Sequence, residues 1–337
     1  MPLRSTSAMA FEEYRRTILW PAVRVLHAFD YAIWLPLVGR LPLFAGYALS
    51  ALRGYLNGLV GRDWRSVGLE TRHVARQSAQ GYRILLHTTS ASELRALVRE
   101  RFATESREEY EGRLIVAGRV EHLRCHRDPR TLEWLHQRQG RGLMLLTPHF
   151  DSFMLGIAFL GLTGMKINVM TSAITNDPKV DPAVSRHFFR KYRAMERLMN
   201  GGQMLDREPG LRPFYQMLAR GECLVILADA PATPGGALVT PHFLGARRKL
   251  AGGALRLAQK TDSDLGAFVC HYECPGRYRL DMGPVHRASD PQALDAAYAF
   301  LSEKIQAAPG RWWAVDLLPL MPVVNERTAP DTEEDVA

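Results

Sequence analysis

A histidine that directly follows an apolar run is the best candidate in this sequence for catalytic chemistry. His149 comes after Leu143–Thr147, a run too short for a helix with its own core and typical of a buried parallel strand. Pro148 interrupts the strand, and Ser152 is placed to start a helix over Phe153–Leu162. Because open α/β sheets bind ligands beyond the carboxyl ends of their strands, we predict that His149 is a general base.

Two carboxylates are candidates to orient this histidine. Asp151 follows it by two residues, and Asp229 comes after a second short apolar run, Cys223–Ala228. Because His149 and Asp229 both follow strands, their side chains are expected at the same edge of the sheet. The alternative roles are local: His149 would satisfy the backbone at a helix start, and Asp229 would cap a turn.

Three arginines are candidates to bind an anionic group. Arg190 belongs to a basic helix predicted over Pro182–Leu198, and Arg247 and Arg248 lie in a basic run. Arginine supplies charge-assisted hydrogen bonds to phosphate, although such runs are more often solvated surface. The net charge of +8, from 43 Lys+Arg against 35 Asp+Glu, also suits an anionic partner. No helix-turn-helix, zinc-finger or RNP pattern indicates nucleic acid.

Metal binding is a weaker prediction. The segment Cys270–Cys274 has a cysteine at each end, but as a strand it would place His271 on the opposite face, with no second ligand pair nearby. Four cysteines in 337 residues are not a disulfide framework and suit a reducing, cytoplasmic compartment. We expect no resident cofactor or metal. A metal-dependent hydrolase is an alternative whose donors would be His149, Asp151, Asp229 and His242.

The elements that must position these residues follow a βαβ pattern from Gly142 onward. Short apolar runs alternate with helical segments, which predicts an α/β fold with a mixed, largely parallel sheet flanked by helices. The predicted strands are Leu143–Thr147, Lys166–Thr171, Gln203–Leu205, Cys223–Ala228, Leu265–Glu273 and Arg277–Met282. The predicted helices are Phe153–Leu162, Pro182–Leu198, Leu211–Arg220, Ala251–Lys260 and Pro291–Ala307.

The amino-terminal region is expected to be an apolar helical extension. Residues 1–30 are predicted to form an amphipathic helix, and Arg40 and prolines interrupt the apolar runs Ala32–Val38 and Leu41–Leu52. No uncharged span of about 18–20 residues results. These runs form either a kinked helical pair at a membrane surface or a buried hairpin, and we favour peripheral membrane association.

Further helices are predicted before the sheet. Ser90 and Glu93 suit a capping box at the start of a helix over Ala91–Thr104, which continues after a break over Glu108–Ala117. Another helix is predicted over Pro129–Gln139.

We expect three parts in the chain. They are a helical, membrane-associating region over residues 1–120, an α/β domain over 121–323 and an acidic, disordered tail over 324–337.

Several sequence blocks occur in an order that indicates a family. They are GRGLMLLTPHFDSFMLG around His149, GECLVILADAPATPGG around Asp229, TPHFLGARRKLAGGALRLAQKT and PGRWWAVD, preceded by LPLVGRLPLFAGYALSALRG and SASELRALVRERFATESREEYE. These blocks resemble those of the lipid A late acyltransferases, the lauroyl/myristoyl transferase family of the lysophospholipid acyltransferase superfamily. The resemblance covers residues from about 31 to about 318.

The resemblance implies transfer of a fatty acyl group from acyl-carrier protein or acyl-coenzyme A to a hydroxyl or amine of a lipid, glycolipid or related acceptor. It implies a peripheral or monotopic location at the cytoplasmic face of the inner membrane. His149 would be the base that deprotonates the acceptor, and Asp151 is the preferred candidate to orient it. The residues expected to bind substrate are Ser152, Arg190, Asp229, Arg247 and Arg248.

One departure from the family pattern leaves three alternatives open. The family has Asp or Glu five residues after its histidine, whereas this chain has Met154, and Asp151 stands where the family has glycine. Asp151 takes over orientation, or a distant carboxylate such as Asp229 does so. In the third alternative the chain has lost acyl transfer and is a non-catalytic protein that binds acyl chains, a carrier protein or a membrane.

Overall fold

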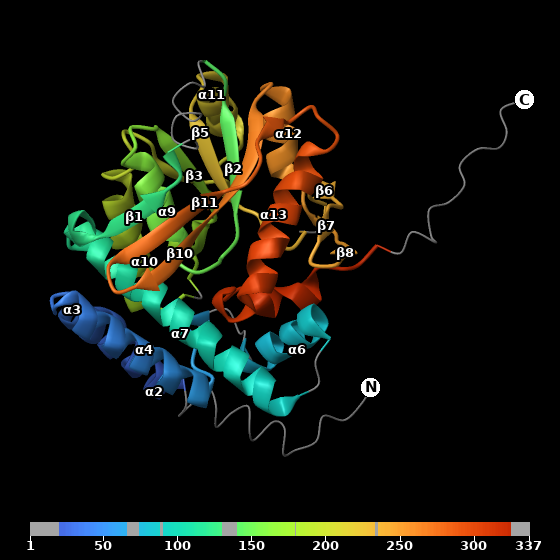
Figure 1. The fold of residues 1–337 in the computed structure, drawn as a ribbon. Helices are drawn as coiled ribbons and strands as arrows, with labels where there is room; N and C mark the ends of the chain where they lie inside the picture. Colours follow the sequence, from blue (N-terminus) through green and yellow to red (C-terminus); the bar gives the residue numbers. More distant parts are fainter. Residues whose placement is uncertain are drawn as a thin grey trace, which may run out of the picture.

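A mostly parallel sheet forms the centre of the molecule, with helices on both of its faces (Figure 1). The computed structural model describes residues 20–65, 74–87, 90–129, 140–178, 180–232 and 235–324. The strand order is β1-β11-β10-β2-β5-β3-β4, and β12 pairs with β10. The strands are β1 (Arg124–Arg127), β2 (Leu143–Thr147), β3 (Ile167–Thr171), β4 (Met204–Asp206), β5 (Cys223–Leu227), β10 (Asp264–Cys274), β11 (Arg277–Met282) and β12 (His286–Arg287).

The central strands are apolar on both faces because each face is covered by helices. Met144 and Leu146 of β2 belong to the core formed with α11–α13, whereas Leu143 and Leu145 belong to the core formed with α9 and α10. This arrangement confirms the predicted α/β fold. The covering helices are α9 (Phe153–Gly161), α10 (Pro182–Glu196), α11 (Arg212–Ala219), α12 (Gly253–Lys260) and α13 (Ala293–Ala307).

A group of amino-terminal helices lies beneath the sheet, where α4 packs along α7 (Figure 1). The helix α6 packs against both α7 and the carboxyl-terminal turn η6. These elements are α2 (Trp20–Phe29), a π-helical turn (Asp30–Trp34), α3 (Leu35–Val38), α4 (Leu43–Val60), α6 (Val74–Leu86), α7 (Ala91–Val116) and η6 (Val315–Leu320). None of the helices that the structure describes combines the length and the hydrophobicity that a membrane-spanning helix requires.

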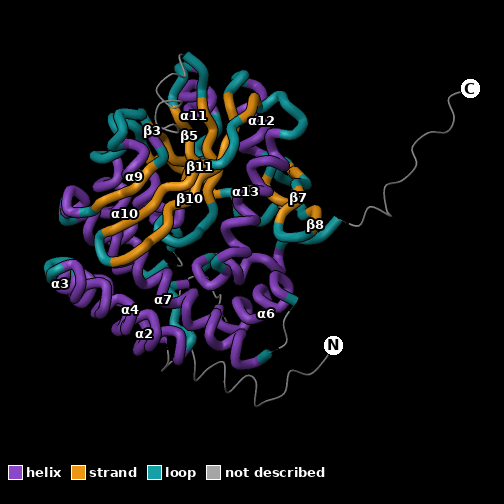
Figure 2. The backbone as a smooth tube through the Cα atoms, viewed as in Figure 1, coloured by secondary structure: helices purple, strands orange, loops and turns teal. Residues whose placement is uncertain are grey.

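The remaining elements are short (Figure 2). Two small antiparallel pairs, β6–β9 and β7–β8, lie outside the main sheet. Their bounds are β6 (Leu238–Val239), β7 (His242–Phe243), β8 (Ala246–Arg247) and β9 (Leu250–Ala251). The other 3-10 turns are η3 (Arg119–His122), η4 (Ala173–Asn176) and η5 (Pro309–Arg311).

The helix α7 corrects one prediction, because it is continuous over Ala91–Val116 and has no break. Its polar middle section is buried, and each charge there has a partner from another element or from α7 itself: Lys191 binds Glu108, and Arg53 binds Glu109. The predicted start of the helix is confirmed, since the Ser90 hydroxyl accepts a hydrogen bond from the Glu93 backbone at 3.4 Å. The polar residues around Glu105 therefore belong to a buried, ion-paired section of one helix and not to a break between two helices.

From Gly142 onward the predicted strands and helices agree with the structure to within two residues at each end, and β2 and β11 have the predicted bounds. The apolar run Leu41–Leu52 instead belongs to a longer helix, α4, which ends at Val60. The strand β1 was missed because its sequence RCHR has no apolar run, as befits an edge strand. Most of the predicted helix Pro129–Gln139, residues 1–19 and nearly all of the predicted tail lie outside the described residues. The domain boundaries at residues 120 and 323 remain a prediction.

Candidate active site

His149 and Asp229 meet at the carboxyl edge of the sheet. The strands β2 and β5 are parallel neighbours, with Thr147 paired to Leu227, so the residues that follow each strand lie side by side. The Asp229 carboxylate accepts a hydrogen bond from the His149 backbone N–H at 2.8 Å, and its other oxygen lies 2.8 Å from His149 Nδ1. With Nδ1–H as the donor to this carboxylate, Nε2 is the ring nitrogen that can accept a proton.

The Asp229 carboxylate is held in an ionised state by its surroundings. Burial alone would raise the pKa of the Asp229 carboxyl, but the interaction with His149 and hydrogen bonds from His149 and Trp312 outweigh burial and hold the pKa below its ordinary value. The Trp312 indole N–H donates to this carboxylate at 2.8 Å. A carboxylate that stays ionised can stabilise an imidazolium at His149.

The tryptophan block near the carboxyl terminus fixes the loop that contains His149. The backbone N–H of Trp313 donates to the His149 carbonyl at 3.2 Å, and the N–H of Asp151 donates to the Arg311 carbonyl at 2.9 Å. The Trp313 ring also packs edge-on to the imidazole, with ring centroids 4.7 Å apart. The block PGRWWAVD was noted in the sequence, but no positioning role was assigned to Trp312 or Trp313.

Asp151 does not orient His149, which corrects the preferred assignment. Its backbone has a φ of 51°, and its fully buried carboxylate forms ion pairs with Arg107 and, at 2.8 Å, with Arg311. The same carboxylate accepts a hydrogen bond from the Tyr272 backbone at 3.1 Å. Asp151 therefore joins the histidine loop to α7 and β10, while Asp229 contacts the imidazole.

Ser152 precedes α9 as expected, but its side chain does not cap the helix. Its buried hydroxyl donates to the Glu111 carboxyl at 3.0 Å, so it is not placed to bind substrate in the cavity described below. Burial raises the pKa of Glu111 to about 8, and repulsion from Asp151 and Glu108 adds to this, against the opposing effects of Arg107 and of the Ser152 hydroxyl.

Glu111 is expected to make the stability of the protein depend on pH. Because its pKa is higher in the folded state than in the unfolded state, its contribution to folding is complete below the unfolded pKa and is lost as the pH rises through about 8. The free energy of unfolding should then fall by up to about 1.4 kcal/mol per pH unit between these values. Urea unfolding of wild type and Glu111→Gln across this range measures the difference. Equal slopes for the two proteins would contradict the prediction.

The three predicted phosphate-binding arginines do not line the site. Arg248 is buried and donates to the carbonyls of Phe243 at 3.1 Å and Met321 at 3.2 Å, which corrects its assignment to substrate. Arg247 is exposed and donates to the Thr240 carbonyl, and Arg190 is exposed on α10. Two other cationic side chains, Lys191 and Arg207, line a cavity beside His149 that is described next, and neither was predicted to belong to the site.

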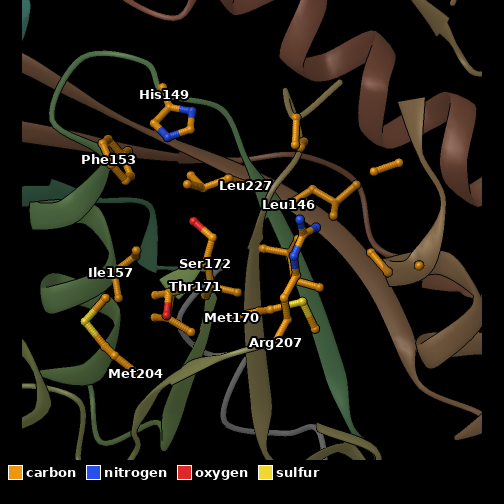
Figure 3. A pocket seen from close by; sticks show the side chains of 18 of the residues that line it. Leu146, His149, Phe153, Ile157, Met170, Thr171, Ser172, Met204, Arg207 and Leu227 are labelled. Carbon is orange, nitrogen blue, oxygen red and sulfur yellow. The ribbon is translucent and has the colours of Figure 1, made fainter. Parts of the chain in front are cut away.

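A cavity of about 460 Å³ opens beside His149 (Figure 3). Most of its lining side chains are apolar, and Met154 is one of them. Met154 stands where the resembled family has an acidic residue, and in this chain its apolar side chain forms part of the cavity wall. The size and apolar lining are typical of a ligand site and suit a fatty acyl chain. Lining residues labelled in Figure 3 include Leu146, Phe153, Ile157, Met170, Met204 and Leu227.

The four proposed metal donors do not all converge, although His149 and Asp229 contact each other. Asp151 faces arginines, and His242 is exposed, with its backbone N–H bound to the Asp295 carboxylate. Within the described part of the chain, no group of three or more His, Cys, Asp and Glu side chains is arranged to hold a metal ion. On β10, Cys270 is buried and Cys274 is exposed.

Comparison with protein families finds one relationship. The family described as bacterial lipid A biosynthesis acyltransferase matches residues 85–316, which is more than two thirds of the chain. The matched stretch contains His149, Asp229 and both tryptophans of the carboxyl-terminal block. No curated protein matches the sequence.

Proposed function

The chain belongs to the family of bacterial lipid A biosynthesis acyltransferases, and from this premise we propose that it transfers a fatty acyl group from a thioester to a lipid acceptor. The donor would be acyl-carrier protein or acyl-coenzyme A, and the acceptor group a hydroxyl or amine of a lipid or glycolipid. One observation carries the proposal: the His149–Asp229 pair lies beside an apolar cavity of about 460 Å³.

In the proposed mechanism His149 is a general base and then a general acid. Nε2 takes the proton of the acceptor O–H or N–H while the acceptor atom attacks the thioester carbonyl carbon. The tetrahedral intermediate collapses with cleavage of the C–S bond, and the departing thiolate receives the proton from the imidazolium. Asp229 keeps Nδ1 protonated and stabilises the imidazolium between the two transfers.

Asp229 supplies the orientation that Met154 cannot. The carboxylate comes from the end of β5 and not from the helix after the histidine, and it contacts both the ring and the backbone of His149. This two-point contact supports the proposal that a distant carboxylate replaces the missing acidic residue.

The test is an acyl-transfer assay with purified protein, long-chain acyl-carrier protein or acyl-coenzyme A, and extracted bacterial lipids. His149→Ala is expected to lower the rate by about 10²–10⁴-fold, the usual contribution of general base catalysis. His242→Ala is the matched control, since this exposed histidine lies outside the cavity. Full activity of His149→Ala would overturn the proposal, and thioester binding by wild type without turnover would indicate the non-catalytic alternative.

An exposed apolar surface on the amino-terminal helices supports the proposal of peripheral membrane association. The helix α4 packs one face on α7 and leaves apolar side chains of its other face exposed. Large exposed apolar patches mark surfaces that contact membranes or other proteins. We propose that this apolar surface lies against the inner membrane at its cytoplasmic face. It comprises Val25, Leu26, Phe29, Ile33, Leu37, Phe44, Leu52, Tyr55, Leu56, Leu59 and Val60.

Charges placed on this apolar surface should weaken membrane binding. Phe44 and Val60 are 71 % and 76 % exposed, so Phe44→Asp with Val60→Asp removes apolar contact without disturbing the core. Binding to vesicles of bacterial phospholipids is expected to fall by at least about tenfold. Co-sedimentation measures this, with Leu162→Asp as the control because Leu162 is exposed just after α9. Equal binding by all variants would contradict the assignment of this surface.

A further inference from the structure

The strands β3 and β5 separate before they end. They are paired from Ile167 with Cys223 to Val169 with Val225. Beyond that point the last residues of β5 pair with β2, and the last residues of β3 pair with β4. A gap therefore opens between the carboxyl ends of two strands that are neighbours in the sheet.

The cavity beside His149 passes through this gap. All four residues of Val225–Ala228 line it, and so do all four residues of Val169–Ser172. Because successive side chains of a strand point to opposite faces, a cavity lined by consecutive residues of both strands reaches both faces of the sheet. The lining residues also belong to two different hydrophobic cores, one on each face of the sheet. Leu146 and Met170 pack with the core of α11–α13, whereas Val169 and Leu227 pack with the core of α9 and α10.

Figure 3 shows the parts of the cavity that lie on the two sides of these strands. Phe153 and Ile157 lie on one side of the strands, and Leu146 and Met170 lie on the other. We name these the α10 side, which His149 adjoins through its ring contact with Phe153, and the α12 side.

The two sides differ in polarity. Apolar side chains form most of the α12 side, to which Arg207 and Tyr298 add polar groups; the apolar ones, which belong to the core of α11–α13, include Leu146, Met170, Ile226, Ala254, Leu255, Leu257, Leu265 and Leu294. The α10 side adds four charged side chains to its apolar lining, Glu105, Glu108, Glu109 and Lys191. Among the residues that the structure describes, Glu105 Oε1 is buried without a hydrogen-bond partner.

We propose that the sheet separates the two substrates: the acyl chain of the thioester passes between β3 and β5 and lies beneath α12, and the acceptor occupies the α10 side. The methylene groups of an acyl chain gain free energy by leaving water for the apolar α12 side, and they leave no polar group there without a partner. On the α10 side, a hydroxyl or amine group of an acceptor finds a hydrogen-bond partner in the Glu105 carboxyl group, because the oxygens of the other glutamates there already bind Lys191, Arg53 and Tyr31. This inference rests on the proposed function, because it assigns a thioester and an acceptor to the cavity. It makes the residues at the start of α12 the determinants of acyl chain length.

Two positions in α12 test this. Ala254 lines the α12 side, and Gly253 lines it with no atom within 4 Å of an added Cβ. Ala254→Phe and Gly253→Leu would therefore shorten the space beneath α12. Met204→Phe is the matched control, since Met204 lines the α10 side and is only partly buried.

The measurement is equilibrium binding of acyl-coenzyme A of graded chain length to the folded full chain, which requires no turnover. Either α12 variant is expected to weaken binding of the longest chains by about tenfold relative to short chains, and Met204→Phe is expected to leave the chain-length profile unchanged. The inference is overturned if both folded α12 variants keep the wild-type profile, or if Met204→Phe alone shifts it. A shifted profile in a protein without transferase activity would support this inference while rejecting the proposed function.

Discussion

Replacement of Asp229 by asparagine is expected to lower the rate of acyl transfer by about 10²–10⁴-fold, with the fold retained. Asparagine keeps the shape of the side chain, but its amide cannot stabilise an imidazolium by charge, and it permits the wrong tautomer of His149. The loss should appear in kcat more than in KM, because the carboxylate contacts the base and is buried behind it.

Thiol release from acyl-coenzyme A, measured alongside product formation, gives this rate. Wild-type activity in Asp229→Asn would show that the Asp229 carboxylate is not needed to orient His149 or to stabilise its imidazolium.

Asp151→Ala is expected to have its main effect on stability. Its carboxylate lies between Arg107 and Arg311 and is fully buried. Removal of one partner from a buried ion pair leaves charge without compensation and costs about 3–5 kcal/mol. We expect the free energy of unfolding to fall by this amount, while the hydrogen bond between His149 and Asp229 persists in the folded protein.

Urea unfolding measures the stability of Asp151→Ala. Glu121→Ala is the control, since the Glu121 side chain is 75 % exposed and its removal should change the free energy of unfolding by less than about 0.5 kcal/mol. If Asp151→Ala unfolds like wild type but loses activity, Asp151 acts in catalysis and the structural role assigned to it is wrong. The two aspartates thus separate catalysis from stability in one pair of variants.

Local sequence predicted the elements of the site well. An apolar run that ends at a turn-forming residue is enough to place His149 and Asp229 after buried strands, because strand formation here depends on burial of consecutive residues. The same reasoning missed β1, whose charged edge residues carry no such pattern. It also predicted a break in α7 that does not exist, because a polar sequence does not reveal that its charged side chains are buried in ion pairs.

Apolar runs and chain breaks are local properties, so they were enough to predict that a histidine and two aspartates lie near the ends of strands. Which aspartate contacts His149 depends on the way the strands pair. The order of strands puts β5 next to β2, and a left-handed turn at Asp151 is accompanied by contacts with arginines of α7 and η5. The separation of β3 from β5, which opens the cavity to both faces, is likewise a matter of strand pairing. Pairing joins residues far apart in the chain, so no local pattern of residues could specify it.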